Sequence, residues 1–250
     1  MYHIMKEVHV TTGQIAYAPA RAERNLLTSD SVAGIGGLTF LILIVFQNVL
    51  RFLTSPANDA SPNQLLQFAH DQAWTVRLLV VTYIIGYPAL LLFAAGLANR
   101  FERAEPRAAI WGELGRMSVI VIAVFFAFVN LLDVLLVAGR TQLANDPNLT
   151  SMIWMLHNAI FTINLLAVAG GLLGLGWGAA LSGLISHRFG WACVAGAVLL
   201  GVAASPMVTE IHGSPFLGIG LLGYLCWILF LLVTSLRLLG TGENERVDQP

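Results

Sequence analysis

The sequence MSVIVIAVFFAFVNLLDVLLVA, residues 117–138, is apolar over the length of a membrane crossing and contains one charged residue, Asp133. A helix needs about 17 to 25 mostly apolar residues to cross about 30 Å of hydrocarbon. Only helices and closed barrels satisfy every backbone group in lipid, and this stretch lacks the alternation of a barrel strand. It therefore predicts a transmembrane helix.

Composition and five further stretches extend this prediction to the whole chain. Hydrophobic residues make up 57% of the sequence, charged residues 11%, and the mean hydropathy is +0.75, whereas charged residues are roughly a quarter of a soluble protein. No segment between the stretches is long enough to bury a core of its own. We expect an all-α, polytopic bundle of six transmembrane helices in one domain, residues 31–237, with the other spans at 32–52, 74–97, 152–180, 190–207 and 216–236.

The basic residues predict an orientation, because cytoplasmic loops carry an excess of Lys and Arg. With the N-terminus inside, ten of the thirteen Lys and Arg residues fall on the inner side, and the outer side keeps Arg51, Arg77 and Arg140. Residues 1–30 and 238–250 then form cytoplasmic segments. The stretch 98–115, which alternates in charge, is expected to be a solvated cytoplasmic connector. This pattern favours a multi-pass protein of a bacterial plasma membrane.

Several classes of function lack support in the sequence. The net charge is −1 and no basic run occurs, so the footprint of a nucleic-acid-binding protein is missing. Cys193 and Cys226 lie far apart in apolar stretches and indicate neither a disulfide framework nor a zinc pair. No Walker sequence, Gly-x-Ser-x-Gly elbow or lysine within a span is present. We therefore lean away from an enzyme.

Small residues recur at intervals of four in the fourth predicted span. Such spacing places them on one helix face, where another helix can approach closely. The second helix could belong to the same chain or to a partner, either a homo-oligomer or another membrane protein. The residues predicted to make this contact are Gly170, Gly174, Gly178 and Ser182.

Polar residues gather at one depth, near the predicted outer face. Asp133 lies about five residues before the outer end of its span, roughly 7 to 8 Å deep at about 1.5 Å per residue, and His157 reaches the same level from the next span. A charged group within a span needs a partner, for which we nominate Arg77 first and His157 second. The full predicted layer is Gln47, Asn48, Arg77, Asn130, Asp133, His157 and Asn164.

Three interpretations of this layer remain open. It could be structural, since hydrogen bonds between membrane helices average only about 0.6 kcal/mol and are common without function. It could be an outward-facing site for a small ligand or a proton, with Asp133 and His157 as the titrating groups. It could also hold a metal or haem, although no paired ligand spacing occurs; the candidate ligands are His70, His157, His212, Asp133 and Glu210.

Residues 74–236 resemble a known group of membrane proteins. The similarity lies in 156–164 (LHNAIFTIN), the glycine-rich stretch to Gly183, 187–192 (HRFGWA) and 223–230 (GYLCWILF). These motifs are similar to uncharacterised actinobacterial six-helix membrane proteins and, through them, to a bacterial membrane family of unknown function. Lys6 is the one lysine among the basic residues, a bias typical of a GC-rich genome. The resemblance implies a six-helix fold and carries no activity, cofactor or catalytic residue.

The function expected from the sequence is therefore broad. Our first hypothesis is a non-enzymatic membrane component, either accessory or handling a small solute, with lipid as its surroundings. A membrane-embedded metal or haem protein, with a possible redox role, is the first alternative. A proton-coupled transporter that uses Asp133 is the second.

Overall fold

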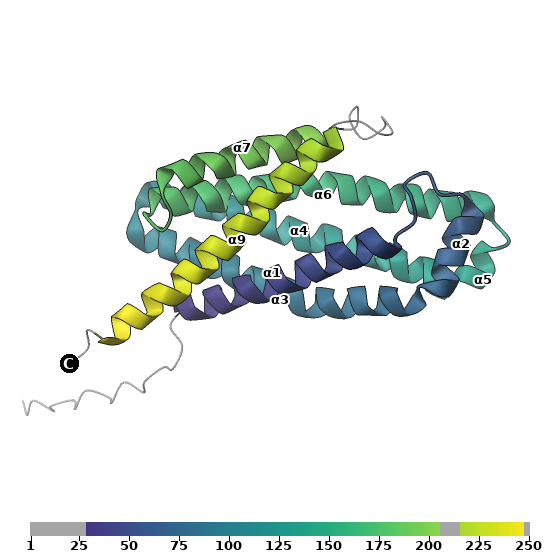
Figure 1. Ribbon diagram of the computed structural model, residues 1–250, viewed down its shortest axis with the longest axis horizontal. Coiled ribbons are helices and arrows are strands. Elements are labelled where there is room, and N and C mark those ends of the chain that lie inside the picture. The colour runs from purple at the N-terminus through teal and green to yellow at the C-terminus, as the bar shows by residue number, and fades with distance from the viewer. Residues whose placement is uncertain (1–28, 206–215, 248–250) are drawn as a thin grey trace, which may run out of the picture.

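The computed structural model describes residues 29–205 and 216–247, with the side chains of the last helix described from residue 219 to residue 240 (Figure 1). Within these ranges the chain is helical and has no strand, which confirms the predicted all-α class. The helices are α1 (Ser29–Thr54), α2 (Pro62–Asp71), α3 (Ala73–Ala104), α4 (Pro106–Ala138), α5 (Arg140–Leu143), α6 (Pro147–Leu181), α7 (His187–Ala203) and α9 (Phe216–Val247).

The helix ends follow local capping signals. At the start of α2, Ser61 and Gln64 form a capping box, in which each side chain accepts from the other residue's backbone N–H. At the start of α6, the Asp146 side chain accepts from the N–H of Leu149. That helix ends just before Gly183, whose φ of 74° lies in the left-handed region that ends many helices. Hydropathy marks the apolar centres, whereas caps mark the ends.

The expected connector at residues 98–115 is wrong. Helix α3 continues to Ala104 and α4 begins at Pro106, so that the extended residue Glu105 alone separates them. Charged residues continue a helix beyond its apolar part at little cost. Proline fits the first position of the next helix, since the N–H that it lacks would have no partner there. Helix α2 begins at Pro62 for the same reason. Helices α2 and α5 were both expected to be loops.

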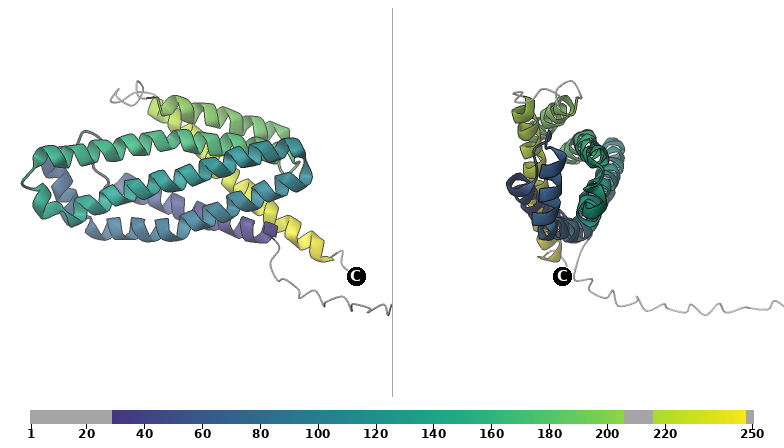
Figure 2. Two further views of the ribbon diagram at one scale, coloured as in Figure 1. Left: turned by 180° about the vertical axis from the view of Figure 1, so that it is seen from behind. Right: turned by 90° about the vertical axis from the view of Figure 1, so that its right-hand side faces the viewer.

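Six helices form a closed ring (Figure 2). Each packs against its neighbours in the order α1, α3, α4, α6, α7 and α9, and α9 returns to α1. In Figure 1, α9 (yellow) crosses the other helices diagonally, and α2 and α5 lie together at one end of the bundle. We call this end, where α1 and α4 finish and α3 and α6 begin, the α2 end.

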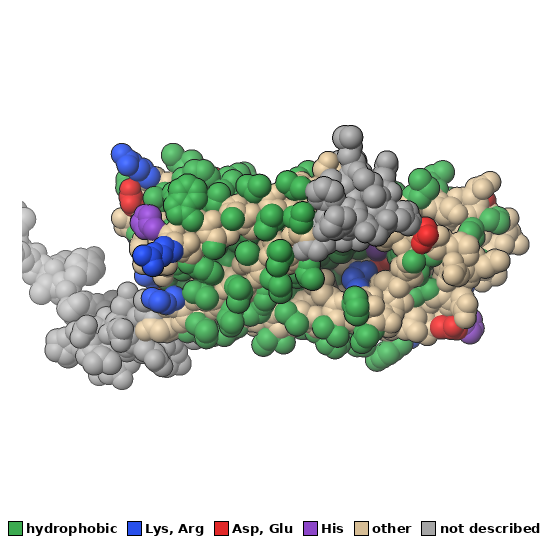
Figure 3. Space-filling view, turned by 45° about the horizontal axis from the view of Figure 1, so that its top comes forward, with side chains coloured by type: hydrophobic (Ala, Val, Ile, Leu, Met, Phe, Trp, Pro, Cys, Tyr) green, Lys and Arg blue, Asp and Glu red, His purple; other side chains and the backbone are tan. Residues whose placement is uncertain are grey.

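Among the described residues, five helical segments are long and apolar enough to cross a membrane: α1, α3, α4, α6 and the part of α9 at Ile219–Gly240. The sixth ring helix, α7, has 17 residues and so rises about 25 Å. It is shifted toward the N-terminus relative to the predicted span 190–207, because it begins at His187 and ends at Ala203. The surface between the two ends is largely hydrophobic, and basic side chains gather at the end opposite the α2 end (Figure 3). This distribution suits a multi-pass membrane protein.

Helices α4 and α6 approach each other closely on the face of α6 that carries Gly170, Gly174 and Gly178. A Cβ atom on Gly174 would lie 2.4 Å from the backbone N of Gly115 and 2.7 Å from the carbonyl O of Trp111. A Cβ on Gly170 would meet Ser118, and one on Gly178 would meet Phe101 of α3. Backbone approach of this kind needs residues without a side chain. Ser182 instead forms the C-cap of α6.

An ion-pair cluster joins α1 to α3 at the end opposite the α2 end. Asp30 is buried at the start of α1 and accepts hydrogen bonds from Arg100 and Arg103 of α3, the latter at 3.1 Å. Its carboxylate lies in the first turn of α1, where negative charge also interacts favourably with the helix dipole. Asp30 is thus part of the helical domain, whereas the sequence assigned it to the N-terminal segment.

We expect Asp30→Asn to lower the free energy of unfolding by about 1 kcal/mol, because the amide keeps the shape but loses the charge on both contacts. Glu113→Gln is the matched control, since its pair with Arg116 is exposed and lies within one helix; solvent screens this pair, so its loss should lower the free energy of unfolding less than Asp30→Asn does. Unfolding in mixed detergent micelles measures both. Equal losses of unfolding free energy would show that the ion pairs between α1 and α3 stabilise the protein no more than an exposed pair within one helix.

Candidate functional site

Three ionisable side chains from three helices meet inside the ring. Arg51 Nη1 of α1 lies 2.9 Å from Asp133 Oδ2 of α4, and His157 Nε2 of α6 lies 3.2 Å from Asp133 Oδ1. Their side chains are 11%, 2% and 7% exposed. A buried carboxylate is stable only when paired, and here it lies between a permanent cation and an imidazole. We call these three residues the Arg–Asp–His triad.

The helix register explains why these side chains converge. Arg51 is four residues after Gln47, and Asp133 is three after Asn130, so each pair shares one face of its helix. On α6, His157 and Asn164 are two turns apart on one face. Gln47, Asn130 and Asn164 are all buried. Helices α1, α4 and α6 therefore each place two polar residues in the interior of the ring.

The segment between α1 and α2 is attached to α6 beside the triad. The His157 ring stacks on Trp154, with ring centroids 4.5 Å apart and an interplanar angle of 12°. Trp154 Nε1 donates to the carbonyl O of Ala57 at 3.0 Å, and Asn158 Nδ2 donates to that of Asn58 at 3.3 Å. These bonds hold residues 55–61 over the side of α6 that carries His157. The segment therefore lies beside the triad at the α2 end.

An aromatic group lies deeper in the ring than the triad. Tyr87 of α3 packs on Phe126 of α4 at 5.3 Å between ring centroids, and Phe126 packs on Phe161 of α6 at 5.9 Å. Phe126 and Phe161 are seven residues before Asp133 and four after His157, on the side away from the α2 end. The interior thus changes from aromatic to ionic within about two helical turns.

Several buried polar atoms near the triad have no hydrogen-bond partner in the described part of the chain. Such atoms are rare in native structures, since each costs about 1 to 3 kcal/mol when left unsatisfied. Asp133 Oδ2 and His157 Nε2 belong to this group, because their ion-pair contacts are close but lack hydrogen-bond geometry. The others that line α1, α3, α4 and α6 are Gln47 Oε1, Arg51 Nε, Arg51 Nη2, Tyr87 OH, Asn130 Oδ1 and Asn164 Oδ1.

The first nominated partner of Asp133 is wrong and the second is right. Arg77 is exposed on α3, because its position on the helix turns it away from the ring. His157 does contact Asp133, and Arg51 takes the place given to Arg77. From the sequence, Arg51 was counted only among the basic residues of the outer side. Its spacing of four from Gln47 was the available signal for an inward face.

Two other predicted members of the layer have structural partners. Gln47 Nε2 donates to Thr82 Oγ1 at 2.6 Å and to the carbonyl O of Leu79 at 3.2 Å, which ties α1 to α3. Asn48 Nδ2 donates to Tyr224 OH at 2.8 Å, which ties α1 to α9. Tyr87 and Tyr224 were not predicted, since a tyrosine inside an apolar stretch gives no polar signal.

Of the proposed metal ligands, Asp133 and His157 meet, but within the described residues no group of three His, Cys, Asp or Glu side chains could hold a metal ion. His70 is exposed on α2 and bonds the neighbouring Asp71 at 2.7 Å. That hydrogen bond from His70 lowers the pKa of Asp71 below its ordinary value. Glu210 and His212 lie outside the described residues.

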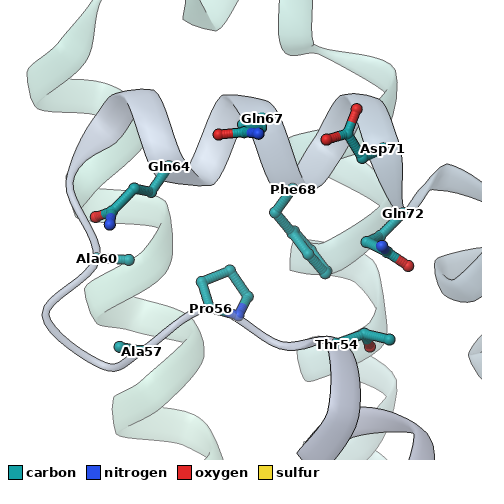
Figure 4. Close-up of a pocket in the computed structure, with 9 residues that line it drawn as sticks. All are labelled: Thr54, Pro56, Ala57, Ala60, Gln64, Gln67, Phe68, Asp71 and Gln72. Carbon is teal, nitrogen blue, oxygen red and sulfur yellow. The ribbon is translucent and has the colours of Figure 1, made fainter.

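A shallow groove of about 250 Å³ lies at the α2 end (Figure 4). The segment between α1 and α2 forms one wall, and the polar face of α2 forms the other. This is the same segment that is bonded to Trp154 and Asn158 on its other side. The lining residues are Thr54, Pro56, Ala57, Ala60, Gln64, Gln67, Phe68, Asp71 and Gln72.

A closed ring of long apolar helices with buried ionic groups in its interior defines a multi-pass membrane helix bundle. The chain belongs to the family described as a domain of unknown function (DUF4386), whose model matches residues 35–234. The match includes α1, which the resemblance noted from the sequence did not reach. No curated protein and no solved structure matches the chain.

Proposed function

We propose that the protein binds a small polar solute inside its helix ring at the α2 end and couples that binding to a proton on the Asp133–His157 pair. The observation that carries the proposal is the group of buried, unpaired polar atoms around the triad. These atoms come from four helices and are free to form hydrogen bonds with a solute. They therefore support a function in which a solute is bound without covalent chemistry.

The cost of these atoms argues against a purely structural layer. A layer that only fixes helix register has its hydrogen bonds satisfied, because each unpaired atom opposes folding. Gln47, through Thr82, and Asn48, through Tyr224, follow this pattern in part. The atoms of Arg51, Tyr87, Asn130 and Asn164 do not. Separation of the helices at the α2 end would give them partners, either water or solute.

The triad is suited to proton exchange. Histidine is the side chain whose unperturbed pKa lies between about pH 5 and pH 8. His157 contacts Asp133, and Arg51 compensates the charge of that carboxylate. Ionisable residues within membrane spans are costly and commonly mark proton or solute pathways. A proton at the pair would therefore change the net charge of the site when a solute binds or leaves.

We further infer six crossings of a bacterial plasma membrane, with both termini in the cytoplasm. The support is the excess of arginine at the junctions of α3 with α4 and of α6 with α7, which lie at the end opposite the α2 end. The apolar helix α7 is the sixth crossing. The triad and the groove then face the outside, where solutes arrive.

Proton flux in proteoliposomes tests this function. We expect one solute class among amino acids, carboxylates, sugars and cations to drive a pH change that a trapped dye reports. Asp133→Asn should abolish that change, because an amide does not exchange a proton in this pH range. Arg77→Gln is the matched control, since Arg77 is exposed and lies outside the triad; it should leave the flux unchanged.

Two results would contradict the proposal. One is equal flux for wild type and Asp133→Asn from about pH 5 to pH 8. The other is the absence of a pH change with every solute class when size-exclusion chromatography shows that the reconstituted protein is folded.

A further inference from the structure

The guanidinium of Arg51 has one used edge and one free edge. Nη1 contacts Asp133 Oδ2 at 2.9 Å. Nε and Nη2 are buried and have no hydrogen-bond partner in the described part of the chain. In an arginine, the N–H of Nε and one N–H of Nη2 point in parallel and form a planar fork, which matches the two oxygens of a carboxylate. The free atoms of Arg51 are this fork.

We propose that the fork binds the carboxylate of a small monocarboxylic acid, which identifies the solute class of the function proposed above and rests on it. A buried fork differs from a surface arginine because it has already lost its water. The guanidinium would donate two charge-assisted hydrogen bonds to a bound carboxylate. These would replace the hydrogen bonds to water that it lost on burial.

The charges around the fork select a single negative charge. Arg51 and Asp133 compensate each other, so the triad is neutral when His157 is neutral and carries one positive charge when His157 is protonated. Tyr87 of α3 and Tyr224 of α9, which lie near the triad among the described residues, carry hydroxyls that are neutral at physiological pH. A monocarboxylate that enters with one proton on His157 leaves the site uncharged. A phosphate, with up to two charges, does not.

The neighbouring side chains fit a small acid with an apolar part. The Tyr87 hydroxyl is buried and unpaired, and Arg51 lies close enough to act on it electrostatically. It is placed to donate a third hydrogen bond to the anion. The aromatic group of Tyr87, Phe126 and Phe161 lies deeper along the same helices, and it offers ring faces to a short hydrocarbon chain.

The free nitrogen atoms of Arg51 are buried in this conformation, so part of the protein has to move before an acid binds. Arg51 Nε and Nη2 have almost no accessible surface. Residues 55–61, attached through Trp154 and Asn158, must therefore move for an acid to reach the fork from the α2 end.

Isothermal titration of the full chain in nanodiscs tests the proposal with acetate, propionate and benzoate at constant ionic strength. Propionamide, inorganic phosphate and chloride are the comparison probes. We expect at least one monocarboxylate to bind and all three comparison probes to bind at least about tenfold more weakly. Propionamide lacks the charge, chloride lacks the pair of oxygens, and phosphate is tetrahedral and in part doubly charged.

Arg51→Lys is the decisive variant, because it keeps the charge beside Asp133 but has no fork. It should weaken binding of the monocarboxylate by about tenfold or more, through loss of one charge-assisted hydrogen bond. Tyr87→Phe removes only a hydroxyl and serves as a second variant if Arg51→Lys does not fold; it should weaken binding by about threefold to tenfold. Arg140→Gln, an exposed arginine at the same end, is the control and should bind as wild type does.

The outcomes separate this inference from the function on which it rests. Lack of binding by all three acids, or unchanged binding by a folded Arg51→Lys or Tyr87→Phe variant, overturns the carboxylate site. Flux driven by a neutral or cationic solute, without carboxylate binding, overturns the inference and leaves the proposed function in place. Binding of a monocarboxylate without any proton flux supports the site and contradicts the coupling.

Discussion

Replacing Gly174 by alanine is expected to destabilise the protein by about 3 kcal/mol or more. The new Cβ would lie 2.4 Å from the backbone N and 2.7 Å from the Cα of Gly115 on α4. Backbone atoms cannot rotate away as the end of a side chain does, so α4 and α6 would have to separate along their whole interface. Unfolding in mixed detergent micelles measures the effect, and a lower yield of folded protein should accompany it.

Gly171→Ala is the matched control on the same helix. A Cβ there would meet Ile122 at 3.5 Å and Trp227 at 3.7 Å, which is ordinary van der Waals contact. Alanine also gains up to about 1 kcal/mol over glycine in a helix. This variant should therefore be neutral or more stable than wild type. If both variants behave alike, α4 and α6 do not pack through Gly174.

Replacing Asp133 by leucine is expected to cost about 3 to 5 kcal/mol, because it leaves the buried Arg51 without its counter-charge. The double variant Arg51→Met with Asp133→Leu removes both charges and should recover most of that loss, since apolar residues of similar volume replace buried ion pairs well. The same unfolding assay gives the coupling free energy from the four proteins.

A double variant that costs as much as the two single variants together would contradict the pairing of Arg51 with Asp133. Arg77→Met combined with Asp133→Leu is the control, because Arg77 is exposed and does not contact the triad. Its two effects should add within about 0.5 kcal/mol.

The candidate site was predictable in depth but not in its contacts. Helical spacing placed Asp133, Asn130, His157 and Asn164 on inward faces at one level, and the structure buries all four. Depth is a property of one helix and can be counted along the sequence. Which side chains touch depends on the rotation of each helix about its axis, and this is why Arg51 rather than Arg77 reaches Asp133.

The metal hypothesis also shows that the sequence does not predict contacts between residues that are far apart in it. His70 and His157 come from different segments, and their types alone made them candidate ligands. In the structure His70 is exposed at the α2 end, whereas His157 is buried against Trp154. Ligand types without spacing gave no information about distance, because distance between segments is set by tertiary packing.

By itself, the sequence determined that the chain is all-helical, where its apolar centres lie and at which depth its polar residues fall. These follow from backbone hydrogen bonding in lipid and from the constant rise of a helix, which act on each segment separately. Only the tertiary structure decided the closed order of the ring, the single-residue junction at Glu105, and the meeting of Arg51, Asp133 and His157. Those depend on how side chains of different helices fit together, as at Gly174 and Gly115.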